Sequence, residues 1–378
     1  MSDRKLASVR RISALDPIPG KDRIVLATVD GWHVIVKKDE FNVGDLCVYC
    51  EIDSVLPQRP EFEFLAKTNY RIKTMKMGGV VSQGICFPLS VVPPIHNTDG
   101  TVTYISYKEG DDVTEAMGVT HYVGNLDSDP VQAPKASDKK KVPGWYKPLM
   151  RFAPMRKLWH ALHPDDRTKG FPSFIAKTDE ERIQNAPYFL DDHEHPYVVT
   201  EKIDGQSGTF ALVRHKSKIP FVRDRFEYIV CSRNVRLGAP NNSSYWAMSE
   251  RYNIESVLRD LIEDNAWVAI QGECVGPGIQ KNKYNFIQRD LYVFNLIYPS
   301  GRLGSLDAVQ IIEKHGMHFV PILDSCYRLP ETVDDMLKYA YGNSTLSNTL
   351  REGVVVRSRD GQKSFKAVSN EFLLKWSE

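Results

Sequence analysis

The first 125 residues alternate between apolar and polar positions in short runs that glycine and proline separate. This period of two predicts strands rather than helices. The predicted strands are Arg23–Val29, Trp32–Lys37, Asp45–Ile52, Tyr70–Met75 and Gly84–Leu89. Five short strands in roughly a hundred residues are typical of a small β-barrel. In the fourth strand Arg71 and Lys73 would share one face, which suits a nucleic-acid surface but is also common on the outside of any barrel.

From Tyr197 onward the pattern mixes strands with helices. The predicted strands are Tyr197–Lys202, Gly208–Val213, Tyr228–Ser232, Trp267–Glu273, Leu291–Ile297 and Gly353–Ser358. Helical periodicity appears at Ser244–Glu263, Leu306–His315 and Glu331–Tyr341. Because the strands and helices do not alternate regularly, the fold class is predicted to be α+β, with antiparallel sheets and flanking helices.

The residues between these two regions differ from both. Residues 131–170 hold ten Lys/Arg against three Asp, and they are rich in proline, with a short helix predicted at Met155–Leu162. Such a basic segment is either a surface for a phosphate backbone or a solvated linker, and the sequence leaves both readings open. We therefore expect a barrel domain at 1–125, a basic Pro-rich linker at 126–170 and an α+β domain at 171–378.

The segment from Lys177 to Asn185 begins with a threonine followed by three acidic residues. Thr178 could cap a helix, and Asp179, Glu180 and Glu181 would lie favourably in its first turn. We therefore predict that a helix starts here.

Composition narrows the class of protein. The chain has 378 residues, enough for two or three domains, and its 42% hydrophobic and 26% charged fractions are those of a globular protein. No run of about eighteen apolar residues is present, and the N-terminus lacks the apolar core of a signal peptide, so we expect an intracellular, soluble protein. Cys47 and Cys50 have the spacing of a zinc knuckle, but no second pair completes four ligands, so reduced, buried thiols are expected.

The sequence Lys202-Ile203-Asp204-Gly205 follows an apolar strand. Such a lysine can act as a nucleophile only when it is neutral, and burial or a neighbouring cation would lower its pKa from about 10.4. Asp204 lies two residues further on, where strand alternation returns it to the same side, in a position to hold a metal ion or its waters. The motif alone also fits a turn beside an exposed lysine.

Other residues that could take part in catalysis or binding follow Lys202 along the chain. Glu273 ends a strand, and Glu352 opens one whose next residues are a glycine and three valines, so its carboxylate needs a cationic partner. Val355 and Phe294 could enclose a flat base but would be equally ordinary in a core. Lys366 and Arg233 are cations near strand ends, suited to phosphate oxygens or to ion pairs with glutamate.

Taken together, these motifs resemble those of the covalent nucleotidyltransferases, the polynucleotide ligases and mRNA capping enzymes. The motifs are Lys202-Ile203-Asp204-Gly205, Cys231-Ser232-Arg233-Asn234, Gln271-Gly272-Glu273, Tyr292-Val293-Phe294-Asn295, Glu352-Gly353-Val354-Val355 and Ser364-Phe365-Lys366. Gln271-Gly272-Glu273 with its continuation to Gln280 resembles RNA ligases. Gly44-Asp45 leading to Glu51–Pro57, and Lys177–Asn185, are similar to RNA ligases of the Naegleria and Deinococcus type, whose N-terminal domain is an oligonucleotide-binding (OB) barrel.

The resemblance implies roles for the catalytic residues. Lys202 would form a lysyl–AMP adduct, and Asp204 and Glu352 would bind Mg²⁺ or Mn²⁺, largely through waters. Arg182 would hold the outgoing phosphates of ATP, and Arg233 a ribose or the RNA 5′-phosphate.

The resemblance also assigns the nucleoside contacts. Glu201 would read the adenine amine, Glu273 would contact the ribose, and Phe294 and Val355 would pack on the adenine.

The last motif departs from the family. Lys366 would contact the α-phosphate, but the family often has Lys-x-Lys here, whereas Ala367-Val368 follows Lys366 in this chain. The second lysine is either missing or supplied from elsewhere, for example by Lys363 or Lys375.

The resemblance thus implies an ATP-dependent RNA ligase that joins a 3′-hydroxyl to a 5′-phosphate and acts in RNA repair, with a DNA ligase or a GTP-dependent capping enzyme as the alternatives. RNA is the expected partner, no membrane is expected, and the chain is expected to be a monomer. Because residues 1–125 hold none of the expected nucleotide-handling residues, the barrel is expected to be separable from the transfer of AMP to Lys202.

Overall fold

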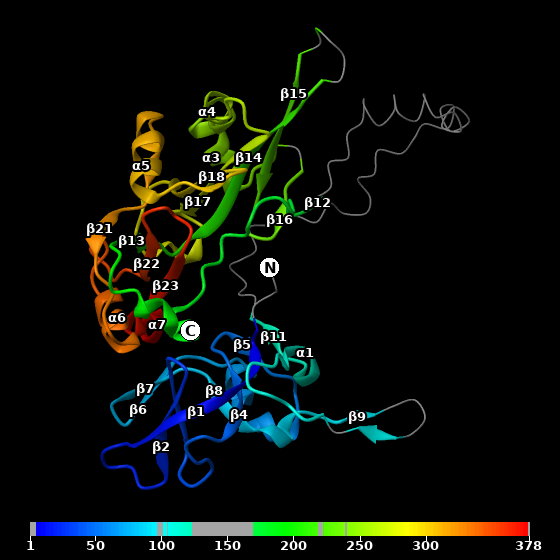
Figure 1. Cartoon of the computed structure of the whole chain (residues 1–378), viewed down its shortest axis with the longest axis vertical. Helices are drawn as coiled ribbons and strands as arrows, with labels where there is room; N and C mark the ends of the chain where they lie inside the picture. Colours follow the sequence, from blue (N-terminus) through cyan, green and yellow to red (C-terminus); the bar gives the residue numbers. More distant parts are fainter. Residues whose placement is uncertain are drawn as a thin grey trace.

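The computed structural model describes residues 5–96, 101–103, 105–122, 169–217, 221, 223–238 and 240–376. Figure 1 shows an N-terminal domain, blue to cyan, at one end of the long axis and a larger C-terminal domain, green to red, at the other. Each has its own apolar core. The expected linker at 126–170 lies outside the described residues, apart from Lys169–Gly170, which pair with the C-terminal sheet. The helix predicted at Met155–Leu162 lies outside them too.

The N-terminal domain is built on a curved sheet in the order β3-β2-β1-β4-β8. One half of β1 pairs with β4 and the other half with β2, so this strand joins the two sides of the sheet. Trp32 and Tyr49 are fully buried at its centre. The elements are β1 (Ala7–Pro17), β2 (Ile24–Val29), β3 (Trp32–Lys37), β4 (Leu46–Cys50), β5 (Ser54–Val55), β6 (Met75–Met77), β7 (Val80–Ser82), β8 (Ile85–Pro88), β9 (Ile95–His96), β10 (Val102–Thr103), β11 (Thr120–His121), α1 (Thr114–Met117) and 3-10 turns at Pro60–Thr68 and Leu89–Val91.

Four of the five strands predicted in this domain are present, and the prediction at Tyr70–Met75 is wrong. Asn69 and Tyr70 both have a positive φ, which breaks an extended run before it starts. Arg71 forms only a single bridge, and its guanidinium pairs with Asp53 at 2.8 Å, so Arg71 and Lys73 do not share a strand face. The sequence analysis also missed β1.

The C-terminal domain contains a large sheet in the order β12-β16-β15-β14-β17-β18-β19, with β20 beside β18, and a second sheet in the order β21-β13-β22-β23. All the pairs are antiparallel except β18 with β20. The strands are β12 (Lys169–Gly170), β13 (Tyr197–Lys202), β14 (Gln206–His215), β15 (Arg225–Cys231), β16 (Val235–Arg236), β17 (Trp267–Val275), β18 (Asp290–Tyr298), β19 (Gly301–Arg302), β20 (His318–Phe319), β21 (Ile322–Tyr327), β22 (Gly353–Ser358) and β23 (Ser364–Val368). The helices are α3 (Ser244–Arg251), α4 (Ile254–Leu261), α5 (Ser305–Lys314), α6 (Val333–Ala340) and α7 (Asn370–Trp376), with 3-10 turns at Ile183–Asn185, Pro187–Asp191 and Gln280–Asn282.

The predicted α+β class and its antiparallel sheets are confirmed, with two local corrections. The helix expected over Ser244–Glu263 is two helices, because Asn253 adopts the left-handed conformation between them. The helix expected from Thr178 is absent, and only a short 3-10 turn follows at Ile183–Asn185.

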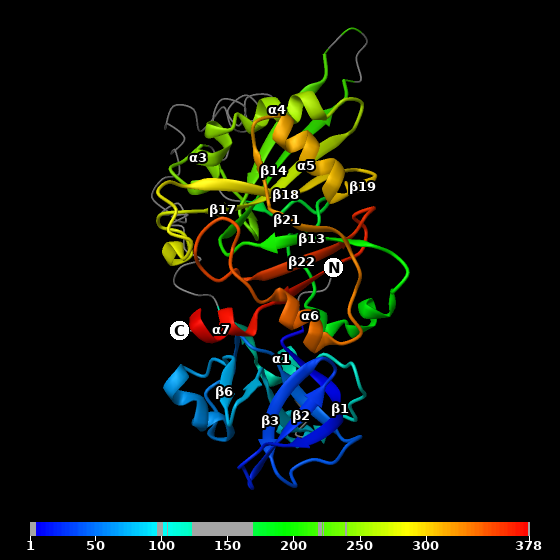
Figure 2. The ribbon, with the colours of Figure 1, turned by 90° about the vertical axis from the view of Figure 1, so that its left-hand side faces the viewer.

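Helices cover one side of each C-terminal sheet (Figure 2). Residues of α3, α4 and α5 pack into the core of the large sheet, and residues of α6 pack into the core of the small one. Along β13, Tyr197 and Val199 enter the α6 core, whereas the last three residues, Thr200, Glu201 and Lys202, all line a cavity. In the part of the chain that the structure describes, no helix is long and apolar enough to cross a membrane.

Five of the six cysteines are buried and Cys326 is exposed, all six as free thiols. Burial, followed by the charge of Cys47, raises the pKa of Cys50 to about 12, so this thiol stays protonated near neutral pH.

Candidate active site

The two C-terminal sheets enclose a cavity of about 240 Å³. Of the ten site residues predicted from sequence, nine line it: Arg182, Glu201, Lys202, Arg233, Glu273, Phe294, Glu352, Val355 and Lys366. The tenth, Asp204, does not line the cavity but lies beside Glu352 and Lys202, whose charges act on it. The sheets therefore gather residues separated by up to 184 positions into one site.

Lys202 ends β13 and is paired across the sheet with Gly353, at the start of β22. This register brings Glu352 next to it, and the Nζ of Lys202 donates a hydrogen bond to Oε2 of Glu352 at 2.6 Å. The cationic partner expected for Glu352 is thus Lys202. Gly205 lets the chain after Lys202 lie close to β17, because a Cβ there would lie 2.4 Å from the carbonyl oxygen of Cys274 and 2.8 Å from Cγ of Glu273.

The charge balance around Lys202 differs from the sequence expectation. Burial alone would lower the pKa of Lys202, but the carboxylates of Glu352, Glu273 and Asp204 outweigh it and raise the pKa above its ordinary value. In the structure without nucleotide, the nucleophile is therefore held as an ammonium ion. Lys202 becomes a neutral nucleophile only if the site gains positive charge or if a neighbouring group accepts the proton of its ammonium.

Carboxyl groups are crowded around Lys202, and burial and their proximity raise the pKa of two of them. Burial, reinforced by Glu352, raises the pKa of Asp204 to about 6. Burial, reinforced by Glu352 and Asp204, raises the pKa of Glu273 to about 8, although Lys202 opposes the shift. Crowded carboxylates of this kind are hard oxygen donors, which suit Mg²⁺ or Mn²⁺. No group of three or more His, Cys, Asp or Glu among the described residues is arranged to hold a metal directly. Asp204 and Glu352 are oxygen donors of the kind that bind Mg²⁺ through its waters.

A second buried lysine lies beside these carboxyl groups, and no sequence signal pointed to it. Nζ of Lys283 lies 2.5 Å from Oδ2 of Asp204, and its side chain is only 12% exposed. The rings of Phe372 and Trp376 on α7 lie 5.1 and 5.9 Å from the same ammonium group. The C-terminal helix thus holds Lys283 against Asp204.

Cations suited to phosphate also line the cavity, and the region around them is called its phosphate end. The side chain of Lys366 is 11% exposed and donates to Oδ1 of Asp179 at 2.7 Å, and Arg233 contacts Oδ2 of the same residue at 3.0 Å. Burial, together with the charges of Arg182 and Lys202, lowers the pKa of Lys366 to about 8. Asp179 therefore gathers two of the expected phosphate ligands around one carboxylate.

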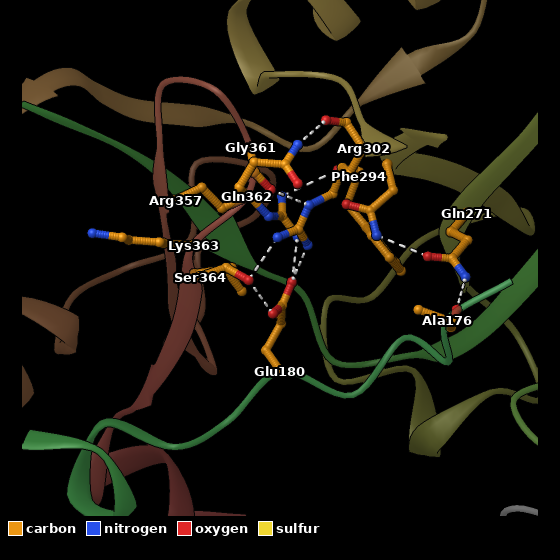
Figure 3. Close-up of polar contacts among 12 residues, drawn as sticks. Ala176, Glu180, Gln271, Phe294, Arg302, Arg357, Gly361, Gln362, Lys363 and Ser364 are labelled. Atoms are coloured by element: carbon orange, nitrogen blue, oxygen red, sulfur yellow. Dashed lines mark hydrogen bonds and ion pairs between the residues drawn. The ribbon is translucent and has the colours of Figure 1, made fainter. Parts of the chain in front are cut away.

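Asp179 and Glu180 explain why the predicted helix does not form. In Figure 3, Glu180 lies at the centre of a network between the two sheets. It accepts hydrogen bonds from Arg302 at 2.7 Å, from Arg357 at 3.1 Å and from the hydroxyl of Ser364. These charge-assisted tertiary contacts replace the favourable helix N-terminus that the sequence suggested.

The same network supports the wall of the cavity where the base is expected. Arg357 is 2% exposed, and its Nη1 donates to the backbone carbonyl of Phe294 at 3.1 Å. Phe294 and Val355 both line the cavity. Lys363, suggested as a replacement for the second motif lysine, is 62% exposed and lies 3.8 Å from Asp192, and neither it nor Lys375 lines the cavity.

Comparison with known proteins identifies the type of site. A family model for RNA ligase matches residues 195–376, and a model for an OB-fold domain matches residues 6–89. The C-terminal domain is therefore similar to the RNA ligase family. The expected OB fold of the N-terminal domain is confirmed by the second match. A comparison with curated proteins found no match.

Solved structures extend this likeness to nearly the whole chain. An apo mutant of Naegleria gruberi RNA ligase is 28% identical, with a TM-score of 0.75, over 99% of this chain and 98% of that one. A mutant of the same ligase with ATP and Mn is 27% identical, with a TM-score of 0.76, over 99% of this chain and all of that one. The complex of that ligase with PPi gives 28% identity and a TM-score of 0.74, over 98% of each chain.

The OB-fold domain also contributes to the site of the RNA ligase domain, which the sequence analysis did not anticipate. Asp53 and His121 line the cavity. The indole N–H of Trp32 donates to Oδ1 of Asn185 at 2.6 Å, and Nδ2 of Asn185 donates to Glu51 at 2.8 Å.

These contacts hold the segment that carries Arg182. The backbone N–H of Gly31 donates to the carbonyl of Gln184 at 2.9 Å, and the guanidinium of Arg182 lies 5.8 Å from the Trp32 ring. A Cβ at Gly31 would lie 2.8 Å from Cα of Gln184, so the two backbones approach closely only because this residue is glycine.

Proposed function

We propose that this protein is an ATP-dependent RNA ligase that joins an RNA 3′-hydroxyl to a 5′-phosphate through lysyl–AMP and adenylylated-RNA intermediates. The observation that carries the proposal is Lys202. Its amine bonds Glu352 in a cavity that is also lined by Phe294 and Val355 and by the cations Arg182, Arg233 and Lys366. The likeness to Naegleria gruberi RNA ligase supports ATP and Mn²⁺ or Mg²⁺ as the nucleotide and the metal.

In the first step, Nζ of Lys202 attacks the α-phosphorus of ATP. A nitrogen–phosphorus bond forms, the bond to the β-phosphate oxygen breaks, and pyrophosphate leaves. The amine must lose a proton, and Oε2 of Glu352, 2.6 Å away, is placed to accept it. Lys366 would neutralise charge on the α-phosphate, and Arg182 would hold the departing pyrophosphate.

A divalent cation bound through its waters near Asp204 and Glu352 would supply positive charge that offsets the α-phosphate and favours the neutral form of Lys202. The protein residues supply the rest of the environment. Glu273 would accept a hydrogen bond from the ribose, and Phe294 and Val355 would enclose the adenine, with the Arg357 contact fixing the backbone of Phe294.

Two further displacements complete joining. An oxygen of the RNA 5′-phosphate attacks the phosphorus of lysyl–AMP, and the lysine amine leaves and regains a proton. The RNA 3′-hydroxyl then attacks the 5′-phosphorus of the adenylylated RNA, and AMP leaves. Arg233 is half-exposed at the mouth of the phosphate end, where a 5′-phosphate could reach it. Sealing of nicks or breaks in RNA is the role that this chemistry supports.

Mass spectrometry tests the first step directly. After incubation with ATP and Mg²⁺, the protein should gain the mass of one AMP in an acid-stable bond on Lys202, and Lys202→Ala should gain none. Labelling of Lys202→Ala to the wild-type level would refute the assignment of the nucleophile.

Comparing substrates tests which nucleotide and which polymer the protein uses. Labelled GTP in place of ATP distinguishes a capping enzyme, and nicked duplexes with DNA or RNA on the 3′-hydroxyl strand distinguish a DNA ligase. RNA should be required chiefly on that strand, because the 2′-hydroxyl distinguishes the two polymers at a given site. Equal sealing of an all-DNA nick would favour the DNA-ligase alternative.

A further inference from the structure

One carboxylate in the cavity is held at one oxygen only. Glu201 is 1% exposed and lines the cavity with Phe294 and Val355. Its Oε2 accepts two hydrogen bonds from Thr345, one from the backbone N–H at 2.9 Å and one from the hydroxyl at 2.8 Å. Both bonds go to the same oxygen, and this fixes how the carboxylate is turned.

The other oxygen, Oε1, is buried and has no hydrogen-bond partner among the described residues. A buried acceptor without a partner costs about 1–3 kcal/mol, so natural proteins rarely keep one that no ligand or water satisfies. A carboxylate oxygen accepts hydrogen bonds and donates none, so its missing partner must be a donor. Within this cavity the acceptor selects for a ligand that presents an N–H or O–H group at that point.

Thr345 is exposed but belongs to a well-anchored loop between α6 and β22. The N–H of Ser344 donates to the carbonyl of Thr349 at 2.8 Å, which closes the loop. The guanidinium of Arg351 donates to the carbonyls of Tyr339 and Ala340 at 2.7 and 3.0 Å, which ties the loop to the end of α6. The loop therefore holds the backbone N–H and the hydroxyl of Thr345 in place as two donors to Glu201.

We propose that Thr345 is a specificity-determining residue that positions Glu201 to recognise the exocyclic amine of adenine. Adenine presents an N–H donor to Oε1. Guanine carries a carbonyl oxygen at the same position, so two hydrogen-bond acceptors would oppose each other. The structure thus assigns nucleotide choice to a loop outside the nucleotidyltransferase motifs. This inference rests on the proposed function, because it assumes that the cavity binds the base of the nucleotide that charges Lys202.

The test compares Thr345→Val with Thr345→Ser, using the rate of lysyl–nucleotide formation from ATP and from GTP. Valine keeps the shape and the backbone N–H but loses the hydroxyl, and serine keeps both donors. Loss of one hydrogen bond to a charged group should lower kcat/KM for ATP about tenfold in Thr345→Val. The loss should appear mainly in KM, because the base contact is made equally in the ground and transition states.

The decisive readout is selectivity. The ratio of kcat/KM for ATP to that for GTP should fall in Thr345→Val and stay near the wild-type value in Thr345→Ser. It should also stay there in Asn348→Ala, an exposed control on the same loop. A second nucleotide, purine riboside triphosphate, lacks the exocyclic amine, so wild type should use it poorly and Thr345→Val should show a smaller penalty against ATP.

The outcomes separate a failure of the proposed function from a failure of the role given to Thr345. If wild type forms no lysyl–AMP, the proposed function fails and the inference falls with it. If lysyl–AMP forms but Thr345→Val keeps the wild-type ATP-to-GTP ratio, only the role of Thr345 is overturned. Wild-type protein that uses purine riboside triphosphate as well as ATP would overturn the role of Glu201 and Thr345 even if the valine variant did not fold.

Discussion

The two ends of the cavity are held in place by different means. At the nucleophile end, Lys202 and Glu352 lie where β13 and β22 pair in register, and the alignment is internal to one sheet. At the phosphate end, Arg182 lies on an irregular segment that joins β23 through one bridge to Lys366 and reaches the sheets through the side chains of Asp179 and Glu180. The OB-fold domain adds a further set of contacts to that segment, through Asn185.

This difference changes the expected role of the OB-fold domain. A domain that only gripped RNA could be removed without affecting the transfer of AMP to Lys202. Here the OB-fold domain holds the segment expected to bind the pyrophosphate, and it lines the cavity with Asp53 and His121. We therefore expect its removal to impair charging with AMP as well as sealing, contrary to the expectation from sequence.

After loss of Lys202 itself, the largest effect on the rate of lysyl–AMP formation is expected at the nucleophile end. Glu352→Ala removes the hydrogen-bond partner of Lys202 and one of the carboxylates suited to a hydrated metal. The rate of lysyl–AMP formation should fall at least ~10²-fold, the cost of losing one preorganised electrostatic group. Pre-steady-state labelling at limiting Mg²⁺ measures this rate. Glu313→Gln, an exposed acid on α5, is the control, and a near-normal rate in Glu352→Ala would make this acid merely structural.

An intermediate effect is expected at the joint between the domains. Asn185→Ala removes the bonds to Trp32 and Glu51 and one to Glu181 in its own segment. At about 1 kcal/mol each, loss of the two bonds to the OB-fold domain should lower kcat/KM for ATP in lysyl–AMP formation by up to about 30-fold. Asn265→Ala, on the turn between α4 and β17, serves as the control.

Trp32→Phe tests whether this effect passes between the domains. It replaces the buried indole, and with it the N–H that bonds Asn185, by a smaller phenyl ring. Because both variants remove this same bond, the double variant should lose less than the two single losses combined. Additive losses, or an Asn185→Ala protein that charges as fast as wild type, would mean that the phosphate end does not depend on the OB-fold domain.

The contrast between residues placed by paired strands and residues placed by an irregular segment also explains what could be predicted from sequence. Lys202, Glu273 and Glu352 lie within or beside strands whose alternation is visible locally, so short motifs located them correctly in one cavity. Asp179 and Glu180 follow a threonine, a local signal for a helix start. That prediction was wrong because their partners, Lys366 and Arg357, lie far along the chain.

Residues without any local pattern were missed altogether. Lys283 reaches Asp204 from a loop of consecutive left-handed residues, and Thr345 reaches Glu201 across 144 positions. Both contacts depend on how the loops pack onto the sheets. Periodicity and short motifs carry no information about that packing, so only the three-dimensional structure reveals these residues.

The smallest effect on the reaction is expected at Glu180, which acts on the stability of the domain more than on its chemistry. Burial alone would raise the pKa of Glu180, but Arg357 and Arg302 outweigh it and hold the pKa below its ordinary value of about 4.3. A carboxylate with a depressed pKa stabilises the folded protein at pH values above its unfolded pKa. That contribution is lost as the pH falls through the folded pKa.

Glu180→Gln should therefore lower the free energy of unfolding by about 3 kcal/mol at pH 7, because it leaves the buried guanidinium of Arg357 and the partly buried one of Arg302 without their anion. The gap between wild type and variant should narrow as the pH falls below about 4, where the wild-type carboxylate also becomes neutral. Urea unfolding of both proteins across that range measures the gap, with Glu313→Gln as the control. A gap that stays constant with pH would show that the stabilisation comes from the shape and hydrogen bonds of Glu180 rather than from its charge.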